Sequence, residues 1–311
     1  MRVDGFRFDE KVPPGGYIWW YLDGVSDDGA NAITIIVFIG SVFSPYYVWA
    51  KKRDPLDHVA VNVALYGKPS RWAMTERGRA DAHQMADAYM VGRSGIRDEG
   101  GAVRVTIDER CAPFPRRLKG EVVMHPHAIS TTGYTIDRAG DHLWRPVAPA
   151  SPIEVRLTEP NLSWRGTGYF DMNWGSCPLE STFSHWDWMR VDLGEGRSAI
   201  FYETEELTGG GKTLALATDR DGSAHSVAPP PRQRLPKTLW RVDRAGWSDG
   251  EGASVRRTLE DTPFYVRTEL DTDVFGARHT AIQESLSLRK FNTPVVRAML
   301  PFRMPRIVRK A

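Results

Sequence analysis

Short runs of β-type residues dominate the pattern of apolar and polar positions along this chain. In the segment Val59 to Tyr66 (VAVNVALY), bulky apolar residues alternate with small or polar ones. Successive side chains of an extended strand point to opposite faces, so a period of two predicts a β-strand. The other segments with strand character are 17–23, 32–43, 103–108, 118–124, 153–157, 189–193, 199–204, 213–217, 254–259 and 264–268.

Turn signals separate these predicted strands. Asp27-Asp28-Gly29 is a hairpin signal, and glycines mark further turns at 194–196, 209–211 and 221–222. Helical signal is weak: Arg79 to Met90 fits a short helix or a long irregular strand, and Gln283 to Leu288 is ambiguous. Many short strands at this spacing predict an all-β chain whose strands close into barrels or sandwiches.

The chain has 311 residues, which fits one large domain or two of ordinary size. The best candidate for a linker is Pro146 to Pro152 (PVAPASP), because prolines cluster there near the middle of the chain. We therefore expect two β domains, at residues 1–150 and 151–311.

Composition narrows the class of function. Hydrophobic residues make up 41% of the chain and charged residues 26%, which is typical of a folded globular protein. The net charge of +2 gives no general basic field for nucleic acid. The 11 tryptophans indicate a large apolar site or interface in addition to a core.

Cysteine usage and apolar runs bear on the compartment. The two cysteines, Cys111 and Cys177, are expected as free thiols in a reducing compartment. The polar start, Met1 to Asp4, predicts no signal peptide. The longest apolar run, Ile33 to Phe43, is shorter than the ~20 residues of a membrane-spanning helix.

The C-terminal segment mixes basic and apolar residues and has no acidic residue after Glu284. This mixture fits the surface of a membrane with anionic lipids, and it fits equally well a terminal segment that packs its apolar side on the protein. Prolines at 294, 301 and 305 rule out one long amphipathic helix. The basic residues are Arg289, Lys290, Arg297, Arg303, Arg306, Arg309 and Lys310.

Several long blocks resemble the carotenoid 1,2-hydratase family, also called hydroxyneurosporene synthases. These blocks are GGYIWWYLDGVSDDGANAITIIVFIGSVFSPYY (15–47), DPLDHVAVNVALYG (54–67), RWAMTERG (71–78), GTGYFDMNWGSCPLE (166–180) and FSHWDWMRVDL (183–193). The resemblance implies two lipocalin-like β halves and the hydration of acyclic carotenoids of the lycopene or neurosporene type without a cofactor. It also implies a cytoplasmic protein peripheral to the inner or photosynthetic membrane, where such substrates dissolve.

Hydration of an isolated terminal alkene sets clear demands on a site. A proton must add to the less substituted carbon, and water must then capture the tertiary carbocation. The site needs a positioned acid, a wall that stabilises the cation, one ordered water and an apolar surrounding.

Asp171 is the candidate acid. It lies in Tyr169-Phe170-Asp171-Met172-Asn173, where a strand would direct residues 169, 171 and 173 to one face. Desolvation among aromatic side chains is expected to raise the pKa of Asp171 and keep it protonated near neutral pH. The alternative is a structural hydrogen bond from Asp171 to a turn.

His142 and Trp144 form a second candidate pair with one shared strand face. The family resemblance implies that this pair faces Tyr169 and Asp171. Trp144 would then stabilise the cation through its ring, while His142 and Tyr169 would manage the water. The alternatives are a surface histidine and a core tryptophan, which is the commoner fate of a tryptophan.

Further residues are candidates for contact with the substrate. Trp19, Tyr21 and Asp23 share one strand face, where they would line the carotenoid channel or supply a second acid. Asn173 is placed beside the candidate acid. His185 shares a face with Asp187, opposite to Trp186 and Trp188. The complete set of expected binding residues is Trp19, Tyr21, Asp23, Asn173, His185 and Trp186.

Other chemistries have weaker support. His125-Pro126-His127 is a poor metal motif, and Gly209-Gly210-Gly211-Lys212 lacks the spacing of a phosphate loop, so we expect neither a metal nor a nucleotide cofactor. No Gly-x-Ser-x-Gly motif indicates a covalent mechanism. Two alternatives stay open: a cofactor-free pericyclase or isomerase of a terpenoid or polyketide, and a carrier of carotenoids or lipids.

Overall fold

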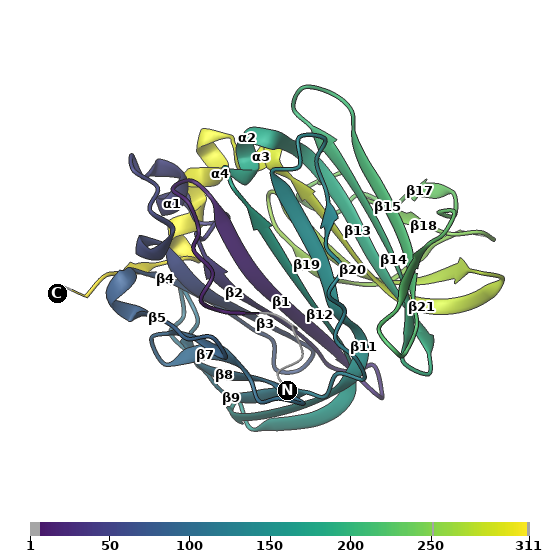
Figure 1. The fold of residues 1–311 in the computed structure, drawn as a ribbon, viewed down its shortest axis with the longest axis horizontal. Helices are drawn as coiled ribbons and strands as arrows, with labels where there is room; N and C mark the ends of the chain where they lie inside the picture. The colour runs from purple at the N-terminus through teal and green to yellow at the C-terminus, as the bar shows by residue number, and fades with distance from the viewer. Residues whose placement is uncertain (1–6, 251, 310–311) are drawn as a thin grey trace. The chain divides into compact units, whose positions relative to one another are not determined.

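The computed structural model describes residues 7–250 and 252–309, which form two compact units (Figure 1). Unit 1 comprises Met1–Tyr134, Asp141–Pro178 and Ala298–Ala311; unit 2 comprises Thr135–Gly140 and Leu179–Arg297. The polar start at Met1 to Asp4 and the basic Lys310 lie outside the described residues. Whether residues 1–150 and 151–311 are separate domains stays a prediction.

Unit 1 is built on one large, mostly antiparallel sheet with the order β22-β4-β3-β2-β1-β12-β11-β9-β8-β7-β6-β5, to which β10 adds by pairing with β11. Its strands are β1 (Tyr17–Ser26), β2 (Ala32–Ile39), β3 (Val59–Tyr66), β4 (Arg71–Arg77), β5 (Ala82–Gln84), β6 (Ala88–Val91), β7 (Ser94–Asp98), β8 (Val103–Arg110), β9 (Arg117–Met124), β10 (Tyr134–Thr135), β11 (His142–Glu159), β12 (Leu162–Gly175) and β22 (Arg306–Ile307). Short helices interrupt it: α1 (Pro45–Trp49), η1 (Pro55–Asp57), η2 (Arg79–Asp81) and η3 (Leu300–Phe302).

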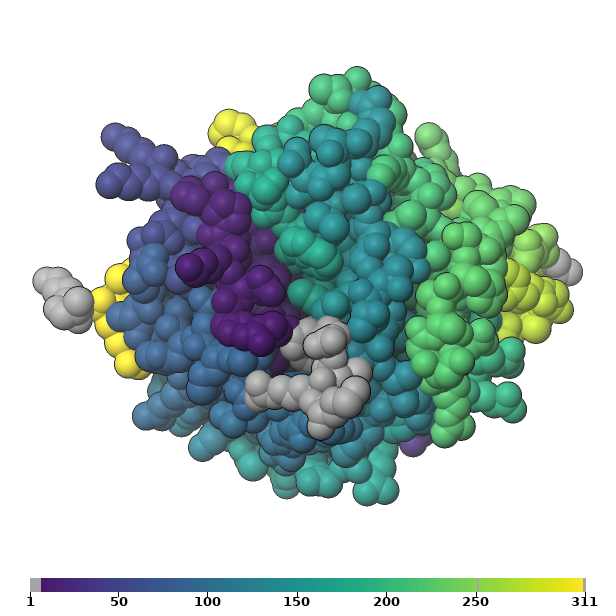
Figure 2. All heavy atoms as spheres, viewed as in Figure 1, coloured from purple at the N-terminus to yellow at the C-terminus, as the bar shows by residue number. Residues whose placement is uncertain are grey.

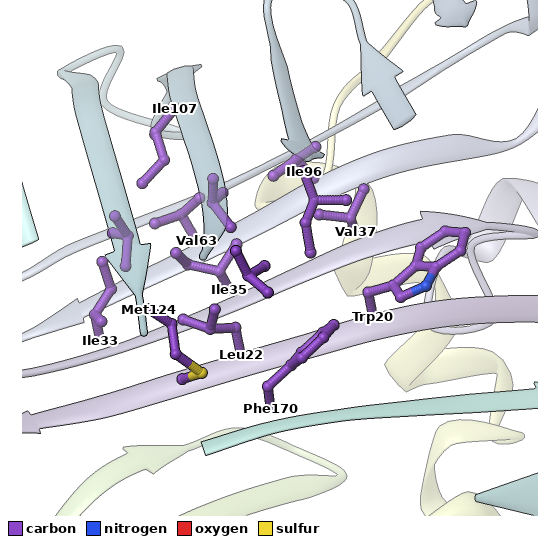
Figure 3. Packing of buried hydrophobic residues seen from close by; sticks show 14 of the residues in the cluster. Trp20, Leu22, Ile33, Ile35, Val37, Val63, Ile96, Ile107, Met124 and Phe170 are labelled. Atoms are coloured by element: carbon purple, nitrogen blue, oxygen red, sulfur yellow. The ribbon is translucent and has the colours of Figure 1, made fainter. Parts of the chain in front are cut away.

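The sheet of unit 1 curls around its own hydrophobic core. Trp20 on β1 packs against Tyr89 on β6 with ring centroids 5.5 Å apart, although these strands lie far apart in the sheet order. The hydroxyl of Tyr89 donates to the carbonyl of Phe38 on β2, 3.2 Å away. Figure 3 shows how side chains from both ends of the sheet fill the concave side, among them Trp20, Leu22, Ile35, Ile96, Ile107 and Phe170. Burial of this apolar surface is the main driving force for the curl.

The predicted linker at Pro146 to Pro152 is wrong, because these residues lie inside the long strand β11. The pairing of β11 with β12 shifts register between Pro146 and Ala148 and again between Ala148 and Ser151. Proline has no backbone N–H for the ladder, and bulges are the places where a strand tolerates its absence. The prolines therefore mark irregularities within a strand.

Unit 2 contains a second antiparallel sheet, with the order β16-β15-β14-β13-β21-β20-β19, and a two-stranded ribbon of β17 and β18. Its strands are β13 (Phe183–Gly194), β14 (Arg197–Glu206), β15 (Gly211–Thr218), β16 (Ala224–Ser226), β17 (Arg232–Arg234), β18 (Ala245–Trp247), β19 (Ser254–Asp261), β20 (Tyr265–Val274) and β21 (Ala277–Ser287). Helices α2 (Leu179–Thr182), α3 (Leu288–Phe291) and α4 (Pro294–Met299) complete the order of elements.

A buried carboxylate fastens the β17–β18 ribbon to the sheet of unit 2. Asp187 on β13 forms an ion pair with Arg232 on β17 and accepts a hydrogen bond from the backbone N–H of Ala245 on β18, at 3.2 Å. It also accepts a hydrogen bond from the hydroxyl of Ser285 on β21. Because Asp187 is almost fully buried, these partners compensate for its desolvation.

The prediction of an all-β chain is confirmed, and each predicted strand overlaps a strand of the structure. The segment Arg79 to Met90 contains the 3₁₀ helix η2 and the strands β5 and β6. The ambiguous segment at 283–288 belongs to β21 up to Ser287. No helix among the described residues is long and apolar enough to cross a membrane.

Both ends of the described chain are fastened to unit 1. The side-chain amide of Gln84 donates to the carbonyls of Phe8 and Glu10, and Figure 2 shows this N-terminal segment in dark purple on the surface beside the blue part of the chain. At the other end, β22 pairs in parallel with the edge strand β4.

Candidate active site

Three adjacent strands of unit 1 bring the candidate residues to one face of the sheet. Because β1 and β12 are antiparallel, Tyr21 pairs with Asp171 and Asp23 pairs with Tyr169. On the other side of β12, Trp144 of β11 pairs with Asn173. We call this surface the carboxylate face; it consists of Tyr17, Trp19, Tyr21 and Asp23 on β1, Tyr169, Asp171 and Asn173 on β12, and His142 and Trp144 on β11.

The opposite faces of the same strands carry the hydrophobic core, with Trp20 and Leu22 on β1 and Phe170 and Met172 on β12. Alternation along the strand therefore separates a hydrophobic core from a face on which polar groups lie among aromatic rings. The side chains of the carboxylate face are all buried. Buried polar groups need hydrogen-bond partners, and the partners here come largely from the same face.

Asp171 lies at the centre of this face with only 5% of its surface exposed. Its Oδ2 atom accepts a hydrogen bond from the indole Nε1 of Trp144 at 2.8 Å and another from the hydroxyl of Tyr169 at 2.8 Å. The structure thus brings together three of the residues that the sequence analysis selected. Two donors aimed at one carboxylate oxygen stabilise the negative charge that remains after a proton leaves.

Tyr169 acts as a neutral donor in this arrangement. Burial, and next the negative charge of Asp171, raise the pKa of the Tyr169 phenol well above its usual value. The phenol therefore keeps its proton throughout the range in which enzymes work. Its ring also meets the ring of Tyr21 edge-on, with centroids 6.0 Å apart.

His142 is held on both sides. Its Nδ1 lies 2.9 Å from the hydroxyl of Tyr17, and its Nε2 lies 3.3 Å from the sulfur of Cys177. The rings of Tyr17 and His142 stack at 5.7 Å. With both ring nitrogens engaged by side chains of unit 1, this geometry favours a positioning role for His142 over direct contact with the attacking water.

Gly175 makes the contact between Tyr17 and His142 possible. It ends β12 and pairs with Tyr17 on one side and with His142 on the other. A Cβ atom at this position would lie 2.6 Å from His142 Nδ1 and 2.6 Å from Tyr17 Cε1. A glycine is required here because the two side chains meet directly above the backbone.

The remaining expected residues of unit 1 also lie on the carboxylate face. Trp19 stacks on Tyr17 with centroids 4.8 Å apart and packs against Phe38 and Phe43. Asn173 sits between Trp19 and Trp144 in the pairing register. Its buried Nδ2 has no hydrogen-bond partner within the described part of the chain, so it is a donor suited to a water or a substrate group.

His185 and Trp186 belong to unit 2 and point to opposite faces of β13. His185 Nε2 lies 3.4 Å from Asp187 Oδ1, on the face that carries the core of unit 2. Trp186 lies on the other face and meets Phe183 and Tyr202 edge-on. A contact of either side chain with substrate stays a prediction.

Tyr17 and Cys177 were missed by the sequence analysis. Both lie within blocks that carry the family resemblance, but neither follows from strand alternation around Asp171. Cys177 is one of two free cysteines among the described residues, the other being Cys111. The only local signal was Tyr17's position two residues before Trp19, on the same strand face.

Among the residues that the structure describes, no three His, Cys, Asp or Glu side chains gather in a way that could hold a metal ion. His125 and His127 therefore lack the further ligands that a metal site would need.

Comparison with known proteins agrees with the sequence resemblance. Residues 35–311 match the family model of the carotenoid hydratase CrtC. The chain is 47% identical over 309 residues to an acyclic carotenoid 1,2-hydratase of Thiocapsa roseopersicina, covering 97% of this chain and 76% of the relative. It is 44% identical over 307 residues to the protein of the same name from Rubrivivax gelatinosus, covering 96% and 76%.

Among solved structures, an AttH-type protein from Nitrosomonas europaea superposes with a TM-score of 0.61 at 14% identity, covering 87% of this chain and 92% of that one. At this identity the likeness shows the fold alone, and it confirms the predicted lipocalin-like β architecture. The two relatives extend over nearly the whole chain, and the family match covers β11 and β12 of the carboxylate face while beginning after β1. The chain therefore belongs to the carotenoid hydratase CrtC family and is a hydro-lyase.

Proposed function

We propose that this enzyme adds water to the terminal C1–C2 double bond of acyclic carotenoids of the lycopene or neurosporene type, with Asp171 as the proton donor. The observation that supports this most directly is the pair of hydrogen bonds from Trp144 and Tyr169 to one oxygen of a buried carboxyl group. The names of the relatives give the substrate class. No cofactor enters the proposal, because each step is a proton transfer or the addition of water.

The first step is proton transfer from Asp171 to C2 of the alkene. Because Oδ2 accepts both hydrogen bonds, the acidic proton belongs on Oδ1, from which it passes to carbon. The donors on Oδ2 become stronger partners as the carboxyl group acquires negative charge. They therefore stabilise the transition state more than the ground state, as acid catalysis requires.

The tertiary cation at C1 needs a wall that lowers its energy. The indole of Trp144 is fixed beside Asp171 by its own hydrogen bond, and the rings of Tyr21 and Tyr169 meet next to it. Aromatic faces attract cations, and they do so more strongly when water is excluded. We assign Trp144 this role, and we assign Tyr169 and Asn173 to the orientation of the water. His142, which is held by Tyr17 and Cys177, is assigned a positioning role at the edge of this face.

A peripheral association with the membrane is the second part of the proposal, because the substrate dissolves in lipid. Exposed apolar side chains of unit 1 gather on the C-terminal segment at Phe302, Ile307 and Val308. Tyr46 contacts both Arg306 and the exposed Trp49, and the exposed Lys51 and Lys52 follow in sequence. Aromatic and aliphatic groups beside lysines are suited to an interface with anionic lipids.

The arginines of the tail are engaged within the protein. Arg303 covers the ring of Trp72 at 4.3 Å, Arg306 pairs with Glu76, and Arg309 lies 3.2 Å from Asp81. We therefore assign lipid contact chiefly to the apolar residues and to Lys51 and Lys52.

The decisive experiment compares the parent enzyme with Asp171→Asn on lycopene in liposomes, with mass analysis of the extracted pigment. The parent is expected to give a product heavier by one water, and the variant to stay folded and lose turnover. Asp27→Asn is the matched control, since this exposed carboxylate lies just beyond the end of β1. Pigment that binds but stays unchanged with the parent would indicate a carrier, and a rearranged product of equal mass would indicate an isomerase.

A further inference from the structure

The carboxylate face contains the same motif twice. Tyr21-Leu22-Asp23 on β1 and Tyr169-Phe170-Asp171 on β12 run antiparallel and in register. In each copy the tyrosine hydroxyl donates to Oδ2 of the aspartate two residues later, at 2.9 Å in the first and 2.8 Å in the second. The rings of Tyr21 and Tyr169, which are diagonal neighbours on the adjacent strands β1 and β12, contact each other edge-on. A local two-fold relation thus places a second buried carboxyl group beside the proposed acid.

We propose that Asp23 is the general base of the hydration, which accepts the proton from the attacking water. This inference rests on the proposed function, because it assigns the second half of the same reaction. Asp23 is fully buried and belongs to the same sheet face as Asp171. His142 is the other titratable candidate, but Tyr17 and Cys177 engage both of its ring nitrogens.

The register of the sheet gives the spacing that such a pair needs. Asp23 pairs directly with Tyr169, so Asp171 is its diagonal neighbour on the adjacent strand. Diagonal neighbours on one face are roughly 7–8 Å apart, with their Cβ atoms somewhat closer. Enzymes that protonate with one carboxyl group and activate water with another separate the two by about 6.5–9.5 Å, which leaves room for that water.

Electrostatics favours one proton on the pair. Two carboxylates buried side by side repel each other, so the first to ionise makes ionisation of the second more difficult. In the reactive form of the proposal, the proton is on Asp171 and the negative charge is on Asp23. One acid and one base are therefore present together, as the addition of water requires.

The steps balance. Asp171 gives its proton to C2, and the π electrons form the new C–H bond, which leaves a cation at C1. A water oxygen bonds to C1 while one of its protons passes to Asp23. The product is the tertiary alcohol, and the enzyme is left with the proton on Asp23 instead of Asp171. A water molecule then carries that proton from Asp23 back to Asp171. This restores the starting state with no other reactant.

The test separates protonation from water capture. When the reaction runs in D₂O, Asp171 delivers deuterium to C2, and the resulting cation can return to alkene by giving a C2 proton back to Asp171. Without a base the capture of water slows, so more cations return and the recovered carotenoid gains deuterium. The three variants to compare are Asp23→Asn, Asp23→Glu and Asp171→Asn, with Asp27→Asn as the control.

For Asp23→Asn we expect the hydration kcat to fall about 100-fold, with KM little changed and deuterium in the recovered substrate. Asp23→Glu should restore part of the hydration, and Asp171→Asn should lose both hydration and exchange. Full hydration by Asp23→Asn would overturn the proposal. So would a folded Asp23→Asn protein that loses exchange together with hydration, because that result would place Asp23 in protonation or in support of the fold. Failure of the parent enzyme to hydrate would overturn the proposed function itself.

Discussion

The hydroxyl of Tyr17 lies 2.9 Å from Nδ1 of His142, although 125 residues separate them in the chain. This contact joins the first strand of the sheet to β11 across the end of β12. It fixes the plane of the imidazole next to Tyr17 and Gly175, at the edge of the carboxylate face. The orientation of His142 is therefore a property of the sheet register.

Removal of this contact should slow catalysis without unfolding the protein. In Tyr17→Phe the ring stacking with His142 remains and only the hydroxyl is lost. A buried hydrogen bond contributes about 1 kcal/mol, so we expect kcat to fall roughly fivefold with KM nearly constant. Steady-state kinetics with lycopene in detergent would measure kcat and KM, and an unchanged kcat would contradict a positioning role for His142.

Gly175→Ala should be more harmful than its size suggests. The added methyl group would lie 2.6 Å from both His142 Nδ1 and Tyr17 Cε1, so one of these side chains must move. Overpacking of this kind costs about 1–3 kcal/mol of unfolding free energy. Denaturant unfolding checks the prediction. The control is Gly101→Ala, where no atom lies within 4 Å of the new Cβ; equal stability of the two variants would argue against the close approach.

The two donors to Asp171 should each contribute to the rate. Tyr169→Phe and Trp144→Phe both delete a hydrogen bond to Oδ2 while keeping an aromatic ring. We expect kcat to fall by about 10² in each variant, the usual effect of removing one donor from a developing negative charge. Rates under single-turnover conditions test this, and a loss confined to KM would show that these residues only bind substrate.

Stability should depend on pH through His58. Burial, and then the charge of Arg306, lower the pKa of His58 from 6.5 to about 4. Its imidazole is thus neutral in the folded protein and protonated in the unfolded chain when the pH lies between these values. The unfolded state binds more protons there, so stability falls as the pH drops from 6.5 towards 4 and levels off below.

The full effect of this histidine is on the order of 3 kcal/mol. Urea unfolding at a series of pH values measures it, with His58→Gln as the comparison. The slope between pH 6.5 and 4 should become shallower in the variant. Identical pH dependence of both proteins would show that His58 does not titrate in this way.

Membrane association should depend on Phe302. Its side chain is 74% exposed, and that of Phe114, far from the C-terminal segment in sequence, is 75% exposed. We expect Phe302→Ser to weaken binding to anionic liposomes about tenfold, since burial of a phenyl ring in lipid contributes about 1.5–3 kcal/mol. Phe114→Ser should have no effect. Sedimentation with vesicles compares them, and equal losses would indicate general hydrophobic adhesion.

Local pattern was sufficient for most of the fold. In Val59 to Tyr66 the alternation alone predicts a strand, because every second side chain of a strand points to the same face. The prediction of a linker at Pro146 to Pro152 was wrong for a physical reason. Prolines usually interrupt a strand, but a β-bulge can accommodate the missing hydrogen bond, and the bulges here form only where β11 pairs with β12. Pairing between strands also decides the structure of Arg79 to Met90. Its strands β5 and β6 pair with each other, and β6 pairs with β7.

The candidate site was predictable in part. That Tyr169 and Asp171 share a face follows from a period of two, and the structure adds the direct hydrogen bond between them. That Trp144 reaches the same oxygen depends on the pairing of β11 with β12, which no local rule provides. Tyr17 and Cys177 were missed for this reason, since their importance arises only from contact with His142.

The parallel pairing of β22 with β4 has a consequence for how the chain is made. Arg306 and Ile307 cover an edge of a sheet whose other strands lie before residue 176. During synthesis the edge of β4 therefore stays open until the ribosome has also produced all of unit 2. An unpaired edge is a template for association with other chains. Nascent molecules should be most prone to aggregate in this interval. The need for chaperones should decrease once the C-terminal segment with β22 has left the ribosome and paired with β4.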